Sequence, residues 1–131
     1  MITLATLHVY SAQQVFDYIS RHLLTQGEKC QEFDDKMNPI CVYRNSSDQS
    51  CAAGCLIGKK EYGLAFKGKD WQAHLYAGKV PSVHHELIFS MQRVHDGCSA
   101  SGWYKALQQV AGDYNFDTSN LDMYAMENNY C

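Results

Sequence analysis

In this 131-residue chain, the side chains that could take part in the most kinds of reaction are those of six cysteines and six histidines. A thiol beside an imidazole can form a nucleophile–base pair, so Cys51 or Cys55 with a histidine would suit a small Cys/His-dependent hydrolase. No spacing selects one such pair. His95 and Asp96 are adjacent on a predicted helix, where neighbouring side chains point about 100° apart, so we do not expect Asp96 to orient His95. We therefore predict no catalytic residues, and the hydrolase stays a third hypothesis.

The same cysteines could bind zinc, but their spacing does not favour it. Cys51 and Cys55 lie four residues apart, and Cys41 lies ten residues before Cys51. The chain has no Cys-x-x-Cys pair and no histidine at the distance usual after one. Its first residues lack the basic and apolar regions of a signal peptide, so we expect a cytoplasmic location, where thiols stay reduced. The prediction is unmetalled thiols, no metal site and no cofactor.

A second kind of chemistry is indicated by residues 59–79, where lysines alternate with aromatic side chains. Five lysines and two acidic residues give this segment a net charge of +3, in a chain whose net charge is −3. Aromatic rings can stack on nucleotide bases while lysines contact phosphates, and Trp and Tyr side chains also anchor protein interfaces. Arg44 ends a predicted strand, and its guanidinium could pair with a carboxylate or a phosphate. The predicted binding residues are Arg44, Lys59, Lys60, Lys67, Lys69, Trp71 and Tyr76.

Composition and charge limit the functions that remain. Hydrophobic residues make up 46% of the chain and charged residues 19%, which is typical of a globular protein and not of a disordered one. The acidic balance argues against binding to bulk duplex DNA and against a polybasic membrane-binding surface. No apolar run approaches the length that spans a bilayer, so we expect no membrane association.

The element that the sequence indicates most strongly is a helix over residues 11–26. Ser11 and Gln14 have the spacing of a capping box at its start. Apolar residues recur at helical spacing as far as Leu23. Gly27 stands where a left-handed residue commonly ends a helix. We expect this helix to form a central part of the core.

Two further helices are expected in the C-terminal half. Ser82 is predicted to cap a helix that ends at Gly97, and another helix is predicted over residues 100–112. Residues 115–131 form an acidic, aromatic C-terminal extension with one weak helix. Its negative charge could attract residues 59–79 within one chain or between the protomers of a homo-oligomer.

A hairpin is expected between these helical regions. Residues 40–44 have the β-branched and aromatic types that favour a strand. Residues 51–57 could return as its partner strand, but their small side chains also allow one helical turn. We interpret residues 28–39 as a loop. Gly54 marks a position where a side chain would not fit against a neighbouring backbone. The prediction is one α+β domain over residues 1–114, with about three helices packed on a small antiparallel sheet or hairpin.

Four segments form a distinctive pattern along the chain. They are His22-Leu23-Leu24-Thr25-Gln26-Gly27, Cys41-Val42-Tyr43-Arg44, Cys51-Ala52-Ala53-Gly54-Cys55-Leu56-Ile57, and Met91-Gln92-Arg93-Val94-His95-Asp96. Together they resemble a family of small phage and prophage accessory proteins, over most of residues 15–111. Members of that family usually carry an acidic residue after the Leu-Ile pair, where this chain has Gly58-Lys59-Lys60. The resemblance implies a phage origin, and by analogy small phage proteins of this kind often disarm bacterial defence.

The expected function follows from this resemblance and from the missing catalytic spacing. We expect a phage-encoded, non-enzymatic inhibitor that binds a bacterial host defence protein in the host cytoplasm. The alternation of lysines and rings leaves a second hypothesis open, a protein that sequesters a nucleotide-type defence signal. No cysteine and histidine have the spacing of a known catalytic pair, and this favours binding over catalysis.

Overall fold

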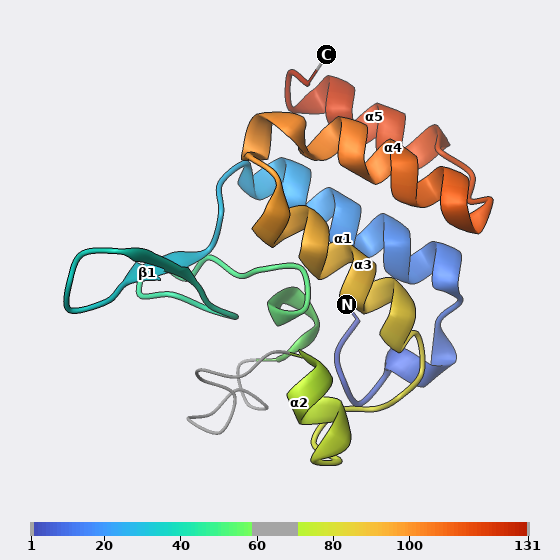
Figure 1. Ribbon diagram of the computed structural model, residues 1–131. Helices are drawn as coiled ribbons and strands as arrows, with labels where there is room; N and C mark the ends of the chain where they lie inside the picture. The colour runs from blue at the N-terminus through green and yellow to red at the C-terminus, as the bar shows by residue number, and fades with distance from the viewer. Residues whose placement is uncertain (1, 59–70, 131) are drawn as a thin grey trace.

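Figure 1 shows a computed structural model of the chain, which describes residues 2–58 and 71–130. These residues form five α-helices and one two-stranded sheet, which confirms the α+β class, although the helices exceed the expected number of about three. None of the helices in these ranges is long and apolar enough to cross a membrane. The elements are α1 (Ala12–Gln26), β1 (Gln31–Phe33), β2 (Pro39–Cys41), α2 (Trp71–Tyr76), α3 (His85–Gly97), α4 (Trp103–Tyr114) and α5 (Ser119–Glu127).

Helix α1 begins and ends where its sequence signals lie. The hydroxyl of Ser11 accepts a hydrogen bond from the main-chain N–H of Gln14 at 3.1 Å, and the Gln14 side chain accepts one from the N–H of Ser11 at 2.9 Å. This reciprocal pair is the predicted capping box. Gly27 adopts a left-handed backbone with φ of 67° and ends the helix, as expected.

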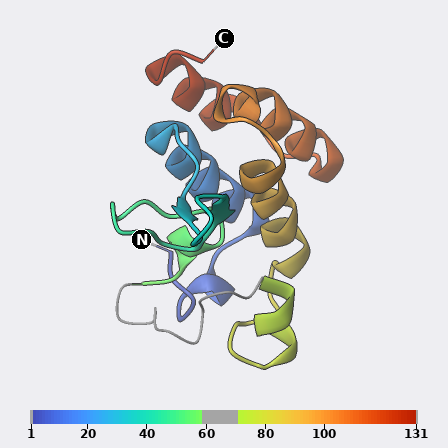
Figure 2. The same ribbon diagram turned by 60° about the vertical axis from the view of Figure 1, so that its left-hand side comes forward.

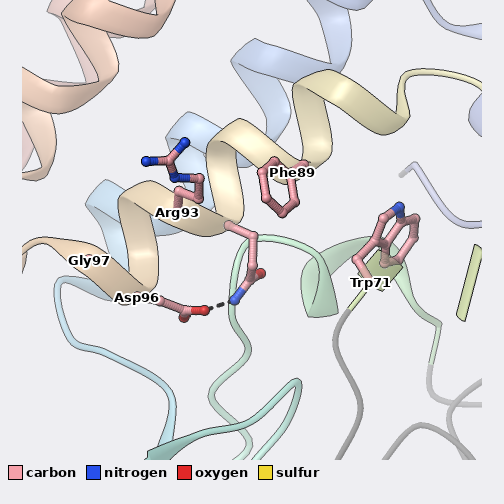
Figure 3. Close-up of a pocket in the computed structure, with 6 residues that line it drawn as sticks. Trp71, Phe89, Arg93, Asp96 and Gly97 are labelled. Carbon is pink, nitrogen blue, oxygen red and sulfur yellow. Dashed lines mark hydrogen bonds between the residues drawn. The ribbon is translucent and has the colours of Figure 1, made fainter. Parts of the chain in front are cut away.

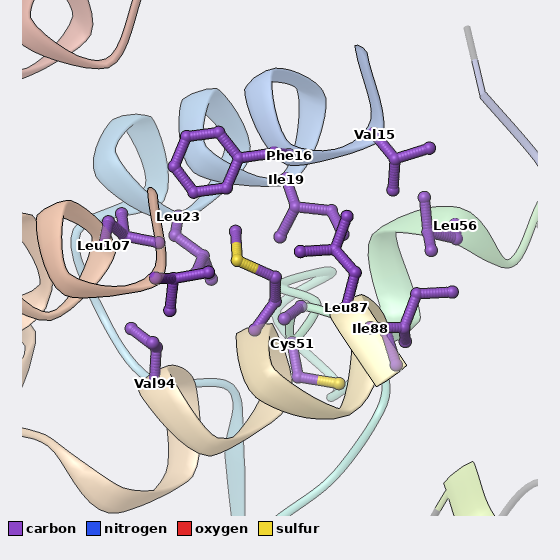
Figure 4. Packing of buried hydrophobic residues seen from close by; sticks show 14 of the residues in the cluster. Val15, Phe16, Ile19, Leu23, Cys51, Leu56, Leu87, Ile88, Val94 and Leu107 are labelled. Carbon is purple, nitrogen blue, oxygen red and sulfur yellow. The ribbon is translucent and has the colours of Figure 1, made fainter. Parts of the chain in front are cut away.

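Helix α1 also lies at the centre of the core. It packs against α3, α4 and α5, and α4 and α5 lie side by side (Figure 1). Apolar side chains from α1, α3 and α4 meet between these helices (Figure 4). Burying one such side chain contributes about 1.5–3 kcal/mol to stability relative to leaving it exposed. The helices supply most of the core. Its largest fully buried members include Phe16, Ile19, Leu23, Ile88, Met91, Trp103 and Leu107.

The sheet matches the predicted hairpin only in part, because β2 overlaps the strand expected over residues 40–44 but pairs with β1 and not with residues 51–57. Strands β1 and β2 pair antiparallel, with Gln31 opposite Cys41 and Phe33 opposite Pro39, and β1 falls within the segment 28–39 that was predicted to be a loop. Strand β2 is exposed and β1 is half-buried at two of its three residues, and the hairpin projects from the helices (Figures 1 and 2). The prediction missed β1 because a strand of three residues is too short to show an alternation of apolar and polar side chains.

Residues 51–57 do not form the expected partner strand but a buried turn, in agreement with the helical turn that their small residues also allowed. The expected pairing remains as one isolated bridge between Arg44 and Ser50. Beyond it the chain winds into a 3-10 turn over Gly54–Leu56. A Cβ atom on Gly54 would lie 2.1 Å from the carbonyl oxygen of Tyr43, which confirms that no side chain fits there.

Helix α3 begins later than predicted. Its N-cap is His84, with φ of 60°, and not Ser82. The Nε2–H of His84 donates to the main-chain oxygen of Tyr10 at 2.7 Å. A contact between distant parts of the chain therefore fixes this helix start, and the local sequence around Ser82 does not report it.

Residues 115–130 pack on the other helices. Helix α5 contacts α1 and α4, and Leu121 is fully buried. The ring centroid of Phe116 lies 5.0 Å from that of Phe16 on α1. The boundary expected at residue 114 therefore does not correspond to a break in the packing.

Candidate binding site

One face of α3 lines a groove with a volume of about 340 Å³. Five of its residues follow the spacing i, i+3, i+4, i+7 and i+8, which places them on one side of an α-helix. Helix α2 contributes the opposite wall (Figure 3). The lining residues are Trp71, Phe89, Gln92, Arg93, Asp96 and Gly97.

Phe89 and Arg93 form the exposed part of the groove. The Phe89 side chain is 46% exposed although it is apolar. The guanidinium carbon of Arg93 lies over its ring, 6.0 Å from the ring centroid. A cation over an aromatic face is attracted by about 0.5–1 kcal/mol at an exposed site. The groove therefore presents an apolar surface and a positive charge side by side, one helical turn apart.

Trp71 forms the inner wall of the groove. Its side chain is only 2% exposed, and its Nε1 atom has no hydrogen-bond partner among residues 2–58 and 71–130. Sequence analysis placed Trp71 among the binding residues, and the structure does bring it to the groove. Most of the ring nevertheless belongs to the core, so removing it would affect the fold as well as the groove.

Asp96 lies at the C-terminal end of the groove with a carboxylate held by three side chains. Its Oδ1 accepts hydrogen bonds from Nδ1 of His95 at 2.6 Å and from Nε2 of Gln92 at 2.9 Å. The thiol of Cys41 forms a third hydrogen bond with Asp96. Partial burial acts to raise the pKa of Asp96, but these hydrogen bonds outweigh burial and hold the pKa below its ordinary value. Asp96 is therefore ionised at neutral pH.

The contact between His95 and Asp96 corrects the expectation that Asp96 does not reach this ring. Neighbouring side chains leave a helix about 100° apart, but their Cα atoms are only about 3.8 Å apart, so the carboxylate can reach. His95 is fully buried, and its ring stacks on that of Trp103 with centroids 5.5 Å apart. Its Nε2 accepts a hydrogen bond from the main-chain N–H of Cys30 at 2.9 Å. Because Nε2 accepts, Nδ1 carries the ring proton and the imidazole is neutral.

Gln92 is oriented in a similar way. Its Oε1 accepts a hydrogen bond from the main-chain N–H of Ala53 at 2.9 Å, which directs Nε2 toward Asp96 (Figure 3). Main-chain groups of two separate segments, at Cys30 and Ala53, thus fix both donors. The fold itself therefore holds the carboxylate in one position.

Cys41, His95 and Asp96 also form a cluster whose ligand-type atoms lie within 4.8 Å of one another. Such a set offers a metal ion one sulfur, one nitrogen and one oxygen. A metal on Nδ1 of His95 would leave the ring proton on Nε2, but Nε2 already accepts the N–H of Cys30. The hydrogen bonds therefore favour a thiol, a carboxylate and an imidazole in direct contact over a metal centre.

Four of the thiols lack the properties of a nucleophile. Burial raises the pKa of Cys30 to about 11 and that of Cys51 to about 12. Burial and the neighbouring Cys51 raise the pKa of Cys55 well above its ordinary value. Partial burial and the carboxylate of Asp96 raise the pKa of Cys41. A nucleophilic cysteine needs a lowered pKa or a free base beside it, and the geometry at these four does not favour the hydrolase hypothesis.

Arg44 makes its contacts within its own region of the chain. Its Nη1 donates to Oδ1 of Asp48 at 2.7 Å, and its Nη2 donates to the main-chain oxygen of Ile57 at 3.4 Å. The guanidinium thus pairs with a carboxylate, as its chemistry predicts, but with one that belongs to this chain. The structure does not bring Arg44 to the α3 groove.

Of the other predicted binding residues, the structure describes only Tyr76. Tyr76 stands near the end of α2 and is 82% exposed, but it does not line the groove. The predicted binding lysines Lys59, Lys60, Lys67 and Lys69 lie outside the described residues.

Sequence analysis did not identify Phe89 and Arg93 as binding residues, although a usable signal was present. The buried side of α3 contains Leu87, Met91 and Val94. Phe89 falls outside that apolar stripe. A large ring outside the apolar stripe of an amphipathic helix is the sequence signal that pointed to this face.

In comparisons with known proteins, no protein-family model, no curated protein and no solved structure matches this chain.

Proposed function

We propose that this protein acts by binding another protein through the α3 groove, and not by catalysing a reaction. The observation that carries the proposal is the exposed ring of Phe89 beside Arg93, on a groove whose far end holds the fixed carboxylate of Asp96. Aromatic and arginine side chains are the types that contribute most often to the affinity of protein interfaces.

The β1–β2 hairpin extends this surface. Cys41 of β2 contacts Asp96, so the base of the hairpin adjoins one end of the groove. The hairpin carries three exposed apolar side chains, Phe33, Met37 and Ile40. A stable interface needs about 800 Å² from each partner, which is more than a groove of this size offers alone. A partner seated in the groove would therefore also contact the hairpin.

The partner that we propose is a component of a bacterial defence system. The resemblance to phage accessory proteins supports this part of the proposal, by analogy. Such a protein would inhibit by occupying a surface that the component needs for its own function. Inhibition of this kind requires affinity and no turnover, in keeping with the raised pKa values of Cys30, Cys41, Cys51 and Cys55.

A nucleotide-type defence signal is the second candidate ligand. A volume of about 340 Å³ falls within the range of small-molecule pockets, and the rings of Phe89 and Trp71 could contact a base. The ionised carboxylate of Asp96 argues against this candidate, because it would repel a phosphate group. A protein partner therefore agrees better with the charges of the groove.

Phage plating on bacterial strains that each carry one defence system tests the proposal. When this chain is expressed, we expect plating to recover on strains that carry one particular system. We also expect one component of that system to co-purify with the chain at equal stoichiometry and with unchanged intact mass. The double variant Phe89→Ala/Arg93→Glu should lose both effects, because it removes the exposed ring and reverses the charge beside it.

The matched control is the double variant Met123→Ala/Lys105→Glu. It makes the same kinds of change at exposed positions of α5 and α4, so plating and co-purification should persist. Recovery of plating that survives Phe89→Ala/Arg93→Glu would contradict the proposal. A change in the covalent mass of the captured component would indicate catalysis, and a nucleotide released on denaturation would favour the second candidate.

A further inference from the structure

We propose that Asp96 receives a basic side chain of the protein partner, a lysine or arginine that enters the α3 groove beside Phe89. This inference rests on the proposed function, since it identifies the chemistry of the residue that the same groove takes. Three observations support it: the charge state of the donors around Asp96, the positions of the nearby cations, and the rigidity of the carboxylate.

The hydrogen bonds to Asp96 do not neutralise its charge. The three donors are the amide of Gln92, the thiol of Cys41 and the imidazole of His95. The imidazole holds one proton, because its Nε2 accepts the N–H of Cys30 and cannot hold a second proton without losing that bond. All three donors are therefore neutral, and the carboxylate keeps a full negative charge.

The nearby cations of the chain are directed elsewhere. Nζ of Lys29 donates to the main-chain oxygen of Asp96 at 3.2 Å and not to its carboxylate. The guanidinium of Arg93 lies over Phe89. Within residues 2–58 and 71–130, no lysine or arginine forms an ion pair with Asp96. A partly buried anion without a counter-ion becomes more favourable when a ligand cation covers it.

The carboxylate is both accessible and rigid. The Asp96 side chain keeps 42% of its surface exposed, so a partner can reach it. Its two nitrogen donors, His95 and Gln92, are themselves fixed by main-chain N–H groups. A surface carboxylate that only contacts solvent does not need hydrogen bonds that fix its position. A carboxylate that pairs with a cation of a partner binds more tightly when its position is fixed in advance.

A basic side chain suits the site better than a bare metal ion does. A metal on His95 would conflict with the hydrogen bond from Cys30, as described above. The rings of Phe89 and Trp71 line the same groove as Asp96 and can pack against the aliphatic stem of a lysine or arginine (Figure 3). A planar guanidinium could also stack on the exposed ring of Phe89.

Selection of peptides from a displayed random library on the immobilised full-length chain tests this inference. We expect the enriched peptides to share a lysine or arginine next to an apolar residue. The best peptide is then synthesised with its basic residue and with a neutral replacement, citrulline for arginine or acetyl-lysine for lysine. Wild-type protein should bind the charged peptide about tenfold or more tightly than the neutral one.

The variant Asp96→Asn should bind both peptides equally. Asparagine keeps an acceptor oxygen for His95 and Gln92, so the comparison isolates the charge. The matched control is Asp113→Asn, because Asp113 accepts from Gln109 with the same i, i+4 spacing but does not line the groove. This control should discriminate as the wild type does. Since each variant is compared with itself on two peptides, a change in stability does not imitate the result.

Three results would overturn the inference. The first is no enrichment, or enriched peptides without a basic residue. The second is discrimination by Asp96→Asn equal to that of the wild type. The third is Zn²⁺ that binds the wild type, competes with the peptide and is lost in Cys41→Ser, which would assign a metal instead. If defence inhibition still requires Phe89 and Arg93 after any of these results, the inference fails while the proposed function stands.

Discussion

The main-chain N–H of Cys30 donates a hydrogen bond to Nε2 of His95 at 2.9 Å. This contact joins the start of the hairpin to the last turn of α3. It also fixes which nitrogen of the ring carries the proton, and so directs Nδ1–H toward Asp96. A main-chain group outside the groove thus positions the carboxylate inside it.

The tautomer of His95 is the first testable consequence. We expect the ring proton on Nδ1 at neutral pH, because Nε2 is occupied as an acceptor. Long-range ¹H–¹⁵N correlation spectra of the imidazole nitrogens measure this directly, with the exposed ring of His8 as the internal comparison. A proton on Nε2, or a doubly protonated ring, would contradict the neutral donor set around Asp96.

His22 should make stability depend on pH. Burial lowers the pKa of His22, although its hydrogen bond to the main-chain oxygen of Ser50 acts in the opposite direction. As pH falls, the unfolded chain therefore takes up this proton before the folded chain does, and the free energy of unfolding decreases. His22→Gln keeps a donor for Ser50 and removes the titration.

Urea unfolding of both proteins between about pH 7.5 and about pH 5 measures this contribution. We expect the wild type to lose more stability over this range than His22→Gln does. The difference should begin near the ordinary pKa of histidine and be complete below the lowered pKa in the folded protein. Equal losses in the two proteins would show that His22 titrates alike in the folded and unfolded states.

Gly54 should tolerate no side chain. In Gly54→Ala the new methyl carbon would lie 2.1 Å from the carbonyl oxygen of Tyr43, so main-chain atoms must move. We expect a loss of about 3 kcal/mol or more in the free energy of unfolding. Gly112→Ala is the control, because its Cβ meets nothing within 4 Å on α4, and it should gain about 0.5–1 kcal/mol. Similar unfolding curves for the two variants would contradict this packing.

Trp71 and Phe89 both line the groove, but substituting Trp71 should mainly affect folding and substituting Phe89 should mainly affect binding. Trp71→Ala removes a buried ring and should cost about 3–5 kcal/mol of stability. Phe89→Ala removes an exposed ring and should change stability by no more than about 0.5 kcal/mol, while defence inhibition is lost. Thermal melts and plating assays on the same two variants check this. If Trp71→Ala keeps the stability of the wild type, the ring is not part of the core. If Phe89→Ala still inhibits defence fully, the exposed ring is not part of the binding surface.

The sequence predicted those elements whose signals are local. Helix α1 was placed to within a residue, because Ser11, Gln14 and Gly27 determine its ends through contacts with their own neighbours. The start of α3 was misplaced, because His84 takes its conformation together with a hydrogen bond to Tyr10, far away in the sequence. Long-range contacts of this kind leave no pattern in a single segment.

The hairpin and the groove were missed for a related reason. Strand β1 has only three residues, so no apolar alternation distinguishes Gln31–Phe33 from a loop. Asp96 draws its position from Cys41, Gln92 and His95, whose donors depend in turn on main-chain groups of other segments. Sequence spacing can place His95 beside Asp96, but it does not show that the main-chain N–H of Cys30 donates to Nε2 of the same ring.

Photo-cross-linking from position 89 in living bacteria tests most directly whether the protein acts by binding a partner in the α3 groove. A photoreactive phenylalanine analogue replaces Phe89 in one chain and the exposed Met123 of α5 in another, and both are irradiated in cells that carry the inhibited defence system. We expect one discrete cross-linked component of that system from position 89 and none from position 123. Co-expressed unlabelled wild type should suppress the cross-link, and Arg93→Glu should not. Cells in which the chain inhibits defence, yet position 89 captures nothing or captures the same proteins as position 123, would contradict a partner in the groove.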